Sequence, residues 1–136
     1  MRLTLLLADA AQVADGKLYI LGGGWSVLNG PAPMAVAMKV EVPWDQANLP
    51  HEWRLELLDQ DGHPVVLGDP GVDKPPVHVG ATIEVGRPAG LPPGTSLDVP
   101  LAVSVGVLAL RPGGYVWRVT IDGETHDTWQ LAFRGR

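Results

Sequence analysis

The sequence predicts an all-β fold, an antiparallel β-sandwich of eight or nine strands with immunoglobulin-like or similar Greek-key connections. Apolar and polar residues alternate with period two through most of the chain, as in half-buried strands. Seventeen glycines and thirteen prolines punctuate these runs without forming a repeat. In addition, no stretch of ten or more residues has the apolar spacing of an amphipathic helix.

Length and composition predict a single domain, residues 1–136, with a substantial core. The chain is 46% apolar and 18% charged, which excludes a disordered tail. Its net charge is −5 and its basic residues do not cluster, so we expect neither a nucleic acid nor an anionic membrane as partner. With no cysteine there is no disulfide or thiolate chemistry. No apolar run could span a bilayer, and we expect a cytoplasmic protein.

The first residues imitate a signal peptide, with a charged start, a leucine run and the triplet Ala8-Asp9-Ala10. However, the apolar run from Leu3 to Ala8 is short, and Asp9 ends it. We therefore expect a first strand whose odd-numbered leucines face inward.

Six later segments alternate in the same way and are expected to be strands. They are residues 34–42, 53–57, 77–85, 99–107, 115–121 and 129–133. Between them, Pro70-Gly71 and several similar pairs predict turns. The segment 43–49 is the one expected helical connector, with Pro43 opening a turn that Asp45 can cap.

The last hairpin contains a conflict between turn and pattern. Asp122-Gly123 favours a two-residue turn, but the pairing it sets would place the apolar residues of the two strands on opposite faces. We expect the pattern to prevail, with a longer or bulged turn and Trp117 near Trp129 or Leu131. The segment LRPGGYVWRVTIDG, residues 110–123, resembles the penultimate strand of immunoglobulin-like domains.

The stretch LYILGGGWSVLNGP, residues 18–31, looks most like a functional motif. A dinucleotide fingerprint needs a helix after its glycines, and the Asn29-Gly30-Pro31 stop leaves no room for one. A phosphate-binding loop needs a Gly-Lys-Ser/Thr sequence, which is absent. We therefore expect the glycines to form a bulge or sharp bend, Trp25 to resume the strand, and no cofactor to bind.

Polar residues do not form a recognisable catalytic or metal set. The four histidines lie at spacings that place no two together on one element, so we expect them at the surface; they are His51, His63, His78 and His126. DQDGH, residues 59–63, is read as a hairpin turn rather than a calcium loop, and ETHDT, residues 124–128, as a solvated turn. We assign no catalytic residue or metal ligand and expect no enzyme activity.

Two features suggest contact surfaces. Trp25 and Trp44 lie beside loops, where they could stack a ring or anchor a partner. Small uncharged residues also line one face of two expected strands: Ala35, Ala37, Ala102, Ser104 and Gly106. Such a face is covered either by a loop, for example residues 86–96, or by a second subunit.

These features favour a non-enzymatic binding or assembly module, with a homo-oligomer or an unknown protein as the expected partner. The alternative is a small-molecule or carbohydrate-binding protein that uses the loop tryptophans.

Two longer motifs point to a family. LTLLLADAAQVADGKLYILGGGWSVL and VEVPWDQANLPHEWRLELLDQDG resemble a family of small bacterial proteins known only as a domain of unknown function. The resemblance spans nearly the whole chain. It implies a stand-alone β-domain made without a secretion signal, and it transfers no activity.

Overall fold

The computed structural model describes residues 1–68 and 74–136, and in these the chain forms nine strands and two short 3-10 turns. They are β1 (Arg2–Ala14), β2 (Lys17–Gly23), β3 (Val27–Leu28), β4 (Pro33–Val42), η1 (Trp44–Gln46), β5 (His51–Asp59), β6 (His78–Ile83), β7 (Leu97–Val107), β8 (Gly113–Ile121), η2 (Asp127–Trp129) and β9 (Gln130–Gly135). The expected Pro70-Gly71 turn lies outside the described residues.

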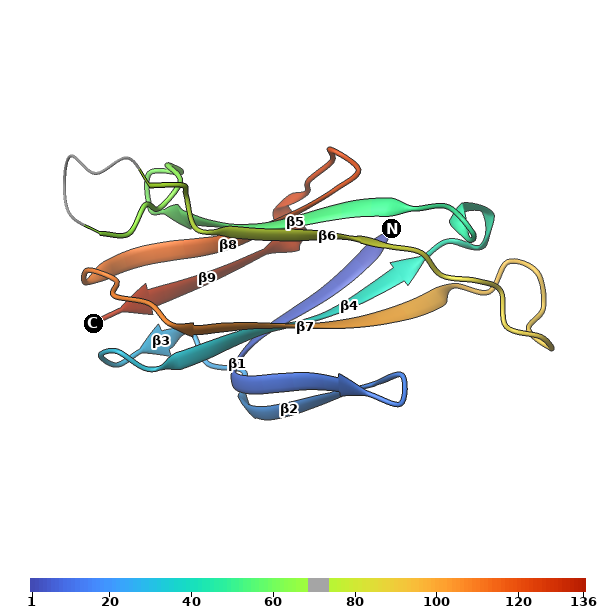
Figure 1. Ribbon diagram of the computed structural model, residues 1–136, viewed down its shortest axis with the longest axis horizontal. Coiled ribbons are helices and arrows are strands. Elements are labelled where there is room, and N and C mark those ends of the chain that lie inside the picture. Colours follow the sequence, from blue (N-terminus) through green and yellow to red (C-terminus); the bar gives the residue numbers. More distant parts are fainter. Residues whose placement is uncertain (69–73) are drawn as a thin grey trace.

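The strands form two facing sheets, which confirms the predicted all-β sandwich (Figure 1). One sheet has the order β2-β1-β4-β7, and the other has the order β3-β9-β8-β5-β6. Within the described part of the chain, no helix is long and apolar enough to cross a membrane.

The core lies between the two sheets and follows the period-two pattern. Alternate residues of β4, β5 and β8 point inward, and Trp117, Leu55 and Val36 are almost completely buried. Trp53 and Trp129 join the same core, as expected. Because each strand contributes one apolar face, two sheets of amphipathic strands bury those faces against each other.

Strand order and one hydrogen bond agree with the immunoglobulin-like prediction. The sequence of neighbours β9-β8-β5 corresponds to strands G-F-C of that fold, and β1-β4-β7 to A-B-E. Tyr115 stands near the start of β8, and its hydroxyl donates to the carbonyl oxygen of Arg111 at 2.6 Å. This is a tyrosine corner, which closes the connection into the corresponding strand of many Greek-key sandwiches.

The last hairpin resolves the conflict differently from the prediction. Trp117 pairs with Leu131, as the apolar pattern requires. However, Asp122-Gly123 also forms its two-residue turn, and the backbones of Ile121 and Glu124 exchange two hydrogen bonds. Excluding this turn was therefore wrong. Residues 125–129, which include η2, form an excursion that shifts the register before β9 begins.

The connector after β4 is shorter than expected. η1 is a single 3-10 turn, and Pro43, rather than Asp45, occupies the position before it. Asp45 lies within the first turn, and no side chain caps that end. The expected cap by Asp45 is therefore wrong.

Candidate binding surface on the β1–β2 ribbon

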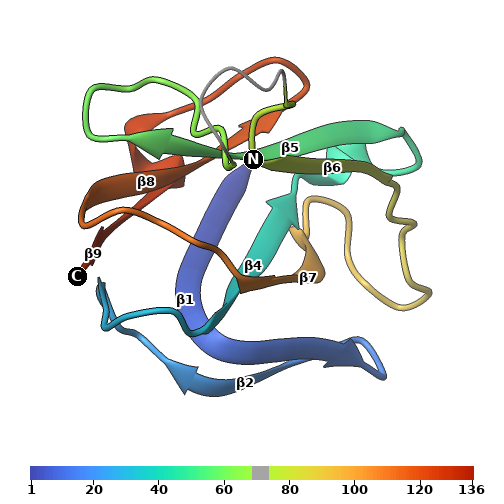
Figure 2. The same ribbon diagram turned by 60° about the vertical axis from the view of Figure 1, so that its left-hand side comes forward.

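β1 has two halves with different neighbours. Residues 2–8 pair with β4, whereas residues 8–14 pair with β2. Past Ala8 the two strands therefore continue as a two-stranded ribbon. Figures 1 and 2 show that this ribbon bends away from the first half of β1 and lies on the side remote from the second sheet. We call residues 9–23 the ribbon.

The tip of the ribbon follows directly from its sequence. Asp15 and Gly16 have φ values of 51° and 70°, the left-handed conformation that a two-residue type I′ turn requires at both positions. Aspartate and glycine adopt this conformation with less strain than other residues. The turn is closed by the pair Ala14 and Lys17.

The base of the ribbon explains the triple glycine. Gly22 has φ +63°, and the carboxylate of Asp9 occupies the space that a side chain there would need. A Cβ on Gly23 would lie only 2.7 Å from Ile20 Cγ2 and 3.1 Å from Leu6 Cδ2. The glycines thus allow a sharp bend and close packing, which confirms the expected bend. Trp25 lies between β2 and β3 rather than in a strand, so the expectation that it resumes the strand is wrong.

Four apolar side chains are exposed on the ribbon. Leu21 is 72% exposed and Tyr19 is 50% exposed, and Val13 and Ile20 are each more than 40% exposed. Beside them is an open hollow of about 370 Å³. It is lined by Ala10, Ala11, Gln12, Tyr19, Ile20 and Leu21. Tyr19 and Leu21 lie on one face of the ribbon, and Val13 and Ile20 lie on the other. Exposed apolar side chains on both faces of one element are typical of a contact surface.

The outer edge of β2 is also open. β2 and β7 are the two edges of the first sheet, and in the described residues no further strand pairs with either. β7 carries Pro100, which cannot donate a hydrogen bond, and Gly106 at φ +78°, which disturbs its regular course. Both features discourage pairing with another chain. β2 has no proline, and its one charged residue is Lys17.

The two loop tryptophans are not free aromatic faces. Trp25 is half-buried and meets Phe133 edge to face, with ring centres 6.5 Å apart. Trp44 is also half-buried, and the guanidinium of Arg87 lies 4.8 Å from its ring centre. Arg87 Nη2 donates to the Trp44 carbonyl oxygen at 2.7 Å, which fixes the guanidinium over the ring.

Trp25 and Trp44 lie at opposite ends of the second sheet. Phe133, which contacts Trp25, pairs with Tyr115 near the start of β8. Trp44 begins η1, and the carbonyl oxygen of Gln46 at the end of η1 is bonded to His51. His51 also contacts Asp122, which follows the end of β8, so Trp44 lies near that end. The structure therefore does not bring the two tryptophans into one stacking site.

The small-residue face is covered, in part, by the chain itself. Ala35 and Ala37 are buried, and both β1 and β2 contact β7 across β4. The expectation that these two alanines face a partner is therefore wrong. Ala102 is half-buried, while Ser104 and Gly106 are exposed on β7.

His51 is the exception among the histidines expected at the surface, because it is buried. Its Nδ1 lies 2.6 Å from Asp122 Oδ2, and its Nε2 lies 2.8 Å from the carbonyl oxygen of Gln46. Burial lowers the pKa of His51, but the bonds to Gln46 and Asp122 outweigh it, so the pKa is raised. The bond from His51 in turn lowers the pKa of Asp122. The cluster ties β5 to η1 and the β8 turn.

DQDGH forms the predicted turn after β5. The ligand atoms of Asp59, Asp61 and His63 lie within 4.8 Å of one another. Asp59 Oδ1 accepts the backbone N–H groups of Asp61 and His63, so this carboxylate closes the turn.

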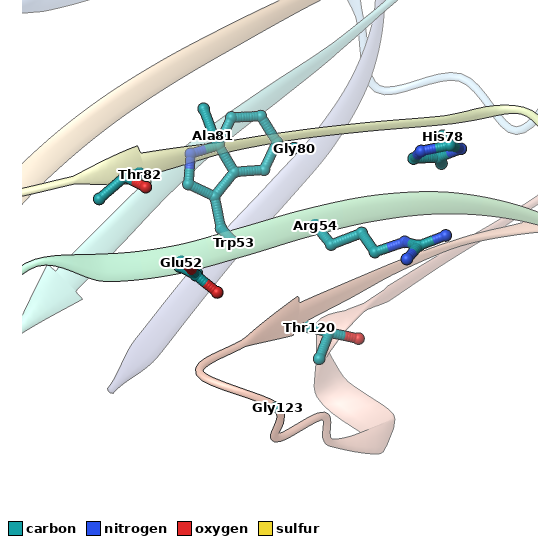
Figure 3. A pocket seen from close by; sticks show the side chains of 9 residues that line it. All are labelled: Glu52, Trp53, Arg54, His78, Gly80, Ala81, Thr82, Thr120 and Gly123. Atoms are coloured by element: carbon teal, nitrogen blue, oxygen red, sulfur yellow. The ribbon is translucent and has the colours of Figure 1, made fainter.

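The outer face of the second sheet carries a polar hollow of about 530 Å³ (Figure 3). Arg54, His78, Gly80 and Thr120 are among its lining residues. Trp53 and Ala81 point to the other side of the sheet in this view. The hollow is broad and open, and its residues come from adjacent positions on neighbouring strands. It lacks the apolar clustering of the ribbon.

The exposed ribbon residues were missed because a strand pattern does not show which strands leave the sheet. One signal was available. LYIL, residues 18–21, is a continuous apolar run that begins two residues after Gly16, and period-two alternation would have required polar residues within it. His51 has no comparable signal, because its partner Asp122 lies 71 residues away.

These features define a β-sandwich of immunoglobulin-like strand order whose most exposed apolar surface is a projecting two-stranded ribbon. The chain belongs to the family of unknown function DUF6941, whose sequence profile matches residues 3–134. Comparison with curated proteins finds no match.

Proposed function

We propose that the chain is a non-enzymatic binding or assembly module that contacts another polypeptide through the ribbon. The observation that carries this proposal is the exposure of Val13, Tyr19, Ile20 and Leu21 on a ribbon whose outer edge pairs with no strand among the described residues. Past Ala8 the two strands have no third strand paired beside them in the described part of the chain, although both contact β7. A partner that covers these side chains would remove apolar surface from water and hold the ribbon in place.

The open edge of β2 also indicates how the partner binds. An extended segment that pairs with it satisfies its outward N–H and C=O groups, and the apolar side chains then select the sequence of that segment. The alternative, a carbohydrate site on Trp25 and Trp44, has less support because Phe133 and Arg87 occupy positions against their rings.

Photo-crosslinking from the ribbon tests the proposal. A benzophenone amino acid is placed at Leu21 or, as a control, at Leu49, an exposed leucine in the loop after η1. In cells that express the protein, we expect a discrete crosslinked product from position 21 that is lost when Tyr19→Asp is added, and none from position 49. Absence of a product at position 21, or equal products at both positions, would contradict the proposal.

A further inference from the structure

We infer that the polypeptide bound by the ribbon is a second copy of this chain, paired antiparallel through β2 about a two-fold axis at Tyr19. This inference rests on the proposed function above and adds the identity of the partner. It would join the four-stranded sheets of two copies into one continuous sheet.

The turn at the tip determines which backbone groups face outward. Closure of the Asp15-Gly16 turn makes Ala14 and Lys17 a hydrogen-bonded pair, because the fourth residue of such a turn donates to the first. Hydrogen bonding alternates along an antiparallel ladder, so the backbone groups of Tyr19 and Leu21 also face β1. Those of Leu18 and Ile20 therefore point toward the open edge.

The glycine bend determines the length of strand that can pair. Gly22 is left-handed, so regular extended backbone runs only from Lys17 to Leu21. Full antiparallel overlap of this segment with its own copy places Tyr19 opposite Tyr19. In the same register Leu18 lies opposite Ile20, and these are the residues whose backbone groups face outward. The edge is thus complementary to itself.

Side chains match in this register. The two Tyr19 side chains meet across the axis at a non-hydrogen-bonded position, where cross-strand neighbours are closest and aromatic pairs are favourable. Lys17 lies opposite Leu21, so its aliphatic stem can cover the most exposed of the large apolar side chains on the ribbon. No like charges oppose each other along the segment.

Each end of the interface with a second copy contains both basic and acidic side chains. Asp9 lies against Gly22, directly beyond Leu21. The two-fold axis brings the end of β2 that carries Lys17 beside the end where Asp9 lies, at both ends of the interface. In a chain of net charge −5, Lys17 then offsets part of the negative charge that Asp9 and the turn residue Asp15 bring to each end of the interface.

Sedimentation and amide exchange test the inference on the intact chain. Between ~1 and ~200 µM the mass should rise from monomer to dimer, as for a small interface. Over the same range the amides of Leu18 and Ile20 should become protected, whereas those of Tyr19 and Leu21 are protected throughout. A monomer at every concentration, with exchange at Leu18 and Ile20 unchanged, would overturn the inference.

Matched variants separate edge pairing from other contacts. Ile20→Pro removes the outward-facing backbone N–H of residue 20 and spares the hydrogen bonds to β1, whereas Ile20→Val keeps that N–H. We expect dimerisation to be at least about tenfold weaker in Ile20→Pro and unchanged in Ile20→Val. Tyr19→Lys keeps every backbone group but places two lysine charges opposite each other across the axis, so it should weaken the dimer similarly. Tyr19→Phe adds no charge and should not weaken it. A dimer as strong as wild type in both Ile20→Pro and Tyr19→Lys also overturns the inference.

The outcome distinguishes the two proposals. A monomeric wild-type chain that crosslinks from Leu21 to a different protein contradicts the dimer and supports the ribbon as a binding surface. A dimer with no crosslink from Leu21 contradicts both proposals.

Discussion

The imidazole Nδ1 of His51 lies 2.6 Å from Asp122 Oδ2, although the two residues are 71 positions apart in the chain. The other ring nitrogen lies 2.8 Å from the Gln46 carbonyl oxygen. Both nitrogens therefore face acceptors, an arrangement that only the imidazolium form satisfies with two N–H donors. Asp122 also accepts the backbone N–H of Glu52 at 3.0 Å, so one carboxylate joins the start of β5 to the turn after β8.

This pair predicts a pH window of greatest stability. The pKa of His51 is raised above its ordinary value of 6.5, so its contribution is complete below that pH and is lost as the pH rises through the raised pKa. The pKa of Asp122 is lowered below 3.8, so its contribution is complete above that pH and is lost on acidification. The pair should therefore stabilise the fold most between pH 3.8 and 6.5. Denaturant unfolding from pH 3 to pH 9, with NMR titration of His51, measures this.

The variant Asp122→Asn isolates the charge. Asn tolerates the left-handed backbone that Asp122 adopts at φ 50°, so the turn should remain. The pKa of His51 should fall, and about 1 kcal/mol of stability should be lost below pH 6, a modest figure because the carboxylate is partly exposed. A His51 pKa unchanged by this variant would show that the pair does not couple to titration.

Gly80 on β6 should be intolerant of a side chain. A Cβ there would lie 2.9 Å from the backbone carbonyl oxygen of Trp53, which cannot move without breaking the pairing of β5 and β6. We expect Gly80→Ala to lower the free energy of unfolding by about 1–3 kcal/mol. Gly86→Ala is the control, because its Cβ would make ordinary contact with Asn48 at 3.5 Å. Equal stability of the two variants in thermal unfolding would contradict this account.

A side chain at Gly22, at the base of the ribbon, should destabilise the fold through both backbone strain and a steric clash. Gly22→Ala forces alanine to φ +63° and into the carboxylate of Asp9, so we expect a loss of about 2 kcal/mol. Adding Asp9→Ala to the Gly22→Ala variant should recover the part of the stability loss that is due to the clash. Gly24→Ala, at φ +93° in open space, should show strain alone. Urea titration of these variants measures their free energies of unfolding. If the double variant is no more stable than Gly22→Ala, a clash with Asp9 is excluded.

Arg87 should hold η1 in place. Its guanidinium donates to the Trp44 carbonyl oxygen from Nε and Nη2 and covers the indole ring. Arg87→Ala should increase amide exchange in residues 44–48 and cost about 1 kcal/mol, a small value because the guanidinium is exposed. Arg87→Lys should give amide exchange and a stability loss between those of the wild type and Arg87→Ala, because lysine keeps the charge but lacks the planar guanidinium. Unchanged exchange in Arg87→Ala would show that η1 is held by other contacts.

Much of the sandwich was predictable because apolar alternation is a local property of a strand. The inward faces of β4, β5 and β8 agree with the pattern, and the register of Trp117 and Leu131 follows from burying one face. The turn at Asp122-Gly123 was wrongly excluded because the excursion through residues 125–129 satisfies both the turn and the pattern. A choice between two local signals fails when intervening residues can accommodate both.

The sequence by itself determined the strand periodicity and the need for glycine at the bend, because each depends on residues close together in the chain. Only the tertiary structure decided which apolar residues remain exposed. Leu21 and Leu7 look alike in sequence, yet Leu7 faces the second sheet and Leu21 lies on a ribbon that has left it. Exposure depends on what packs against a face, and packing partners here come from distant parts of the chain.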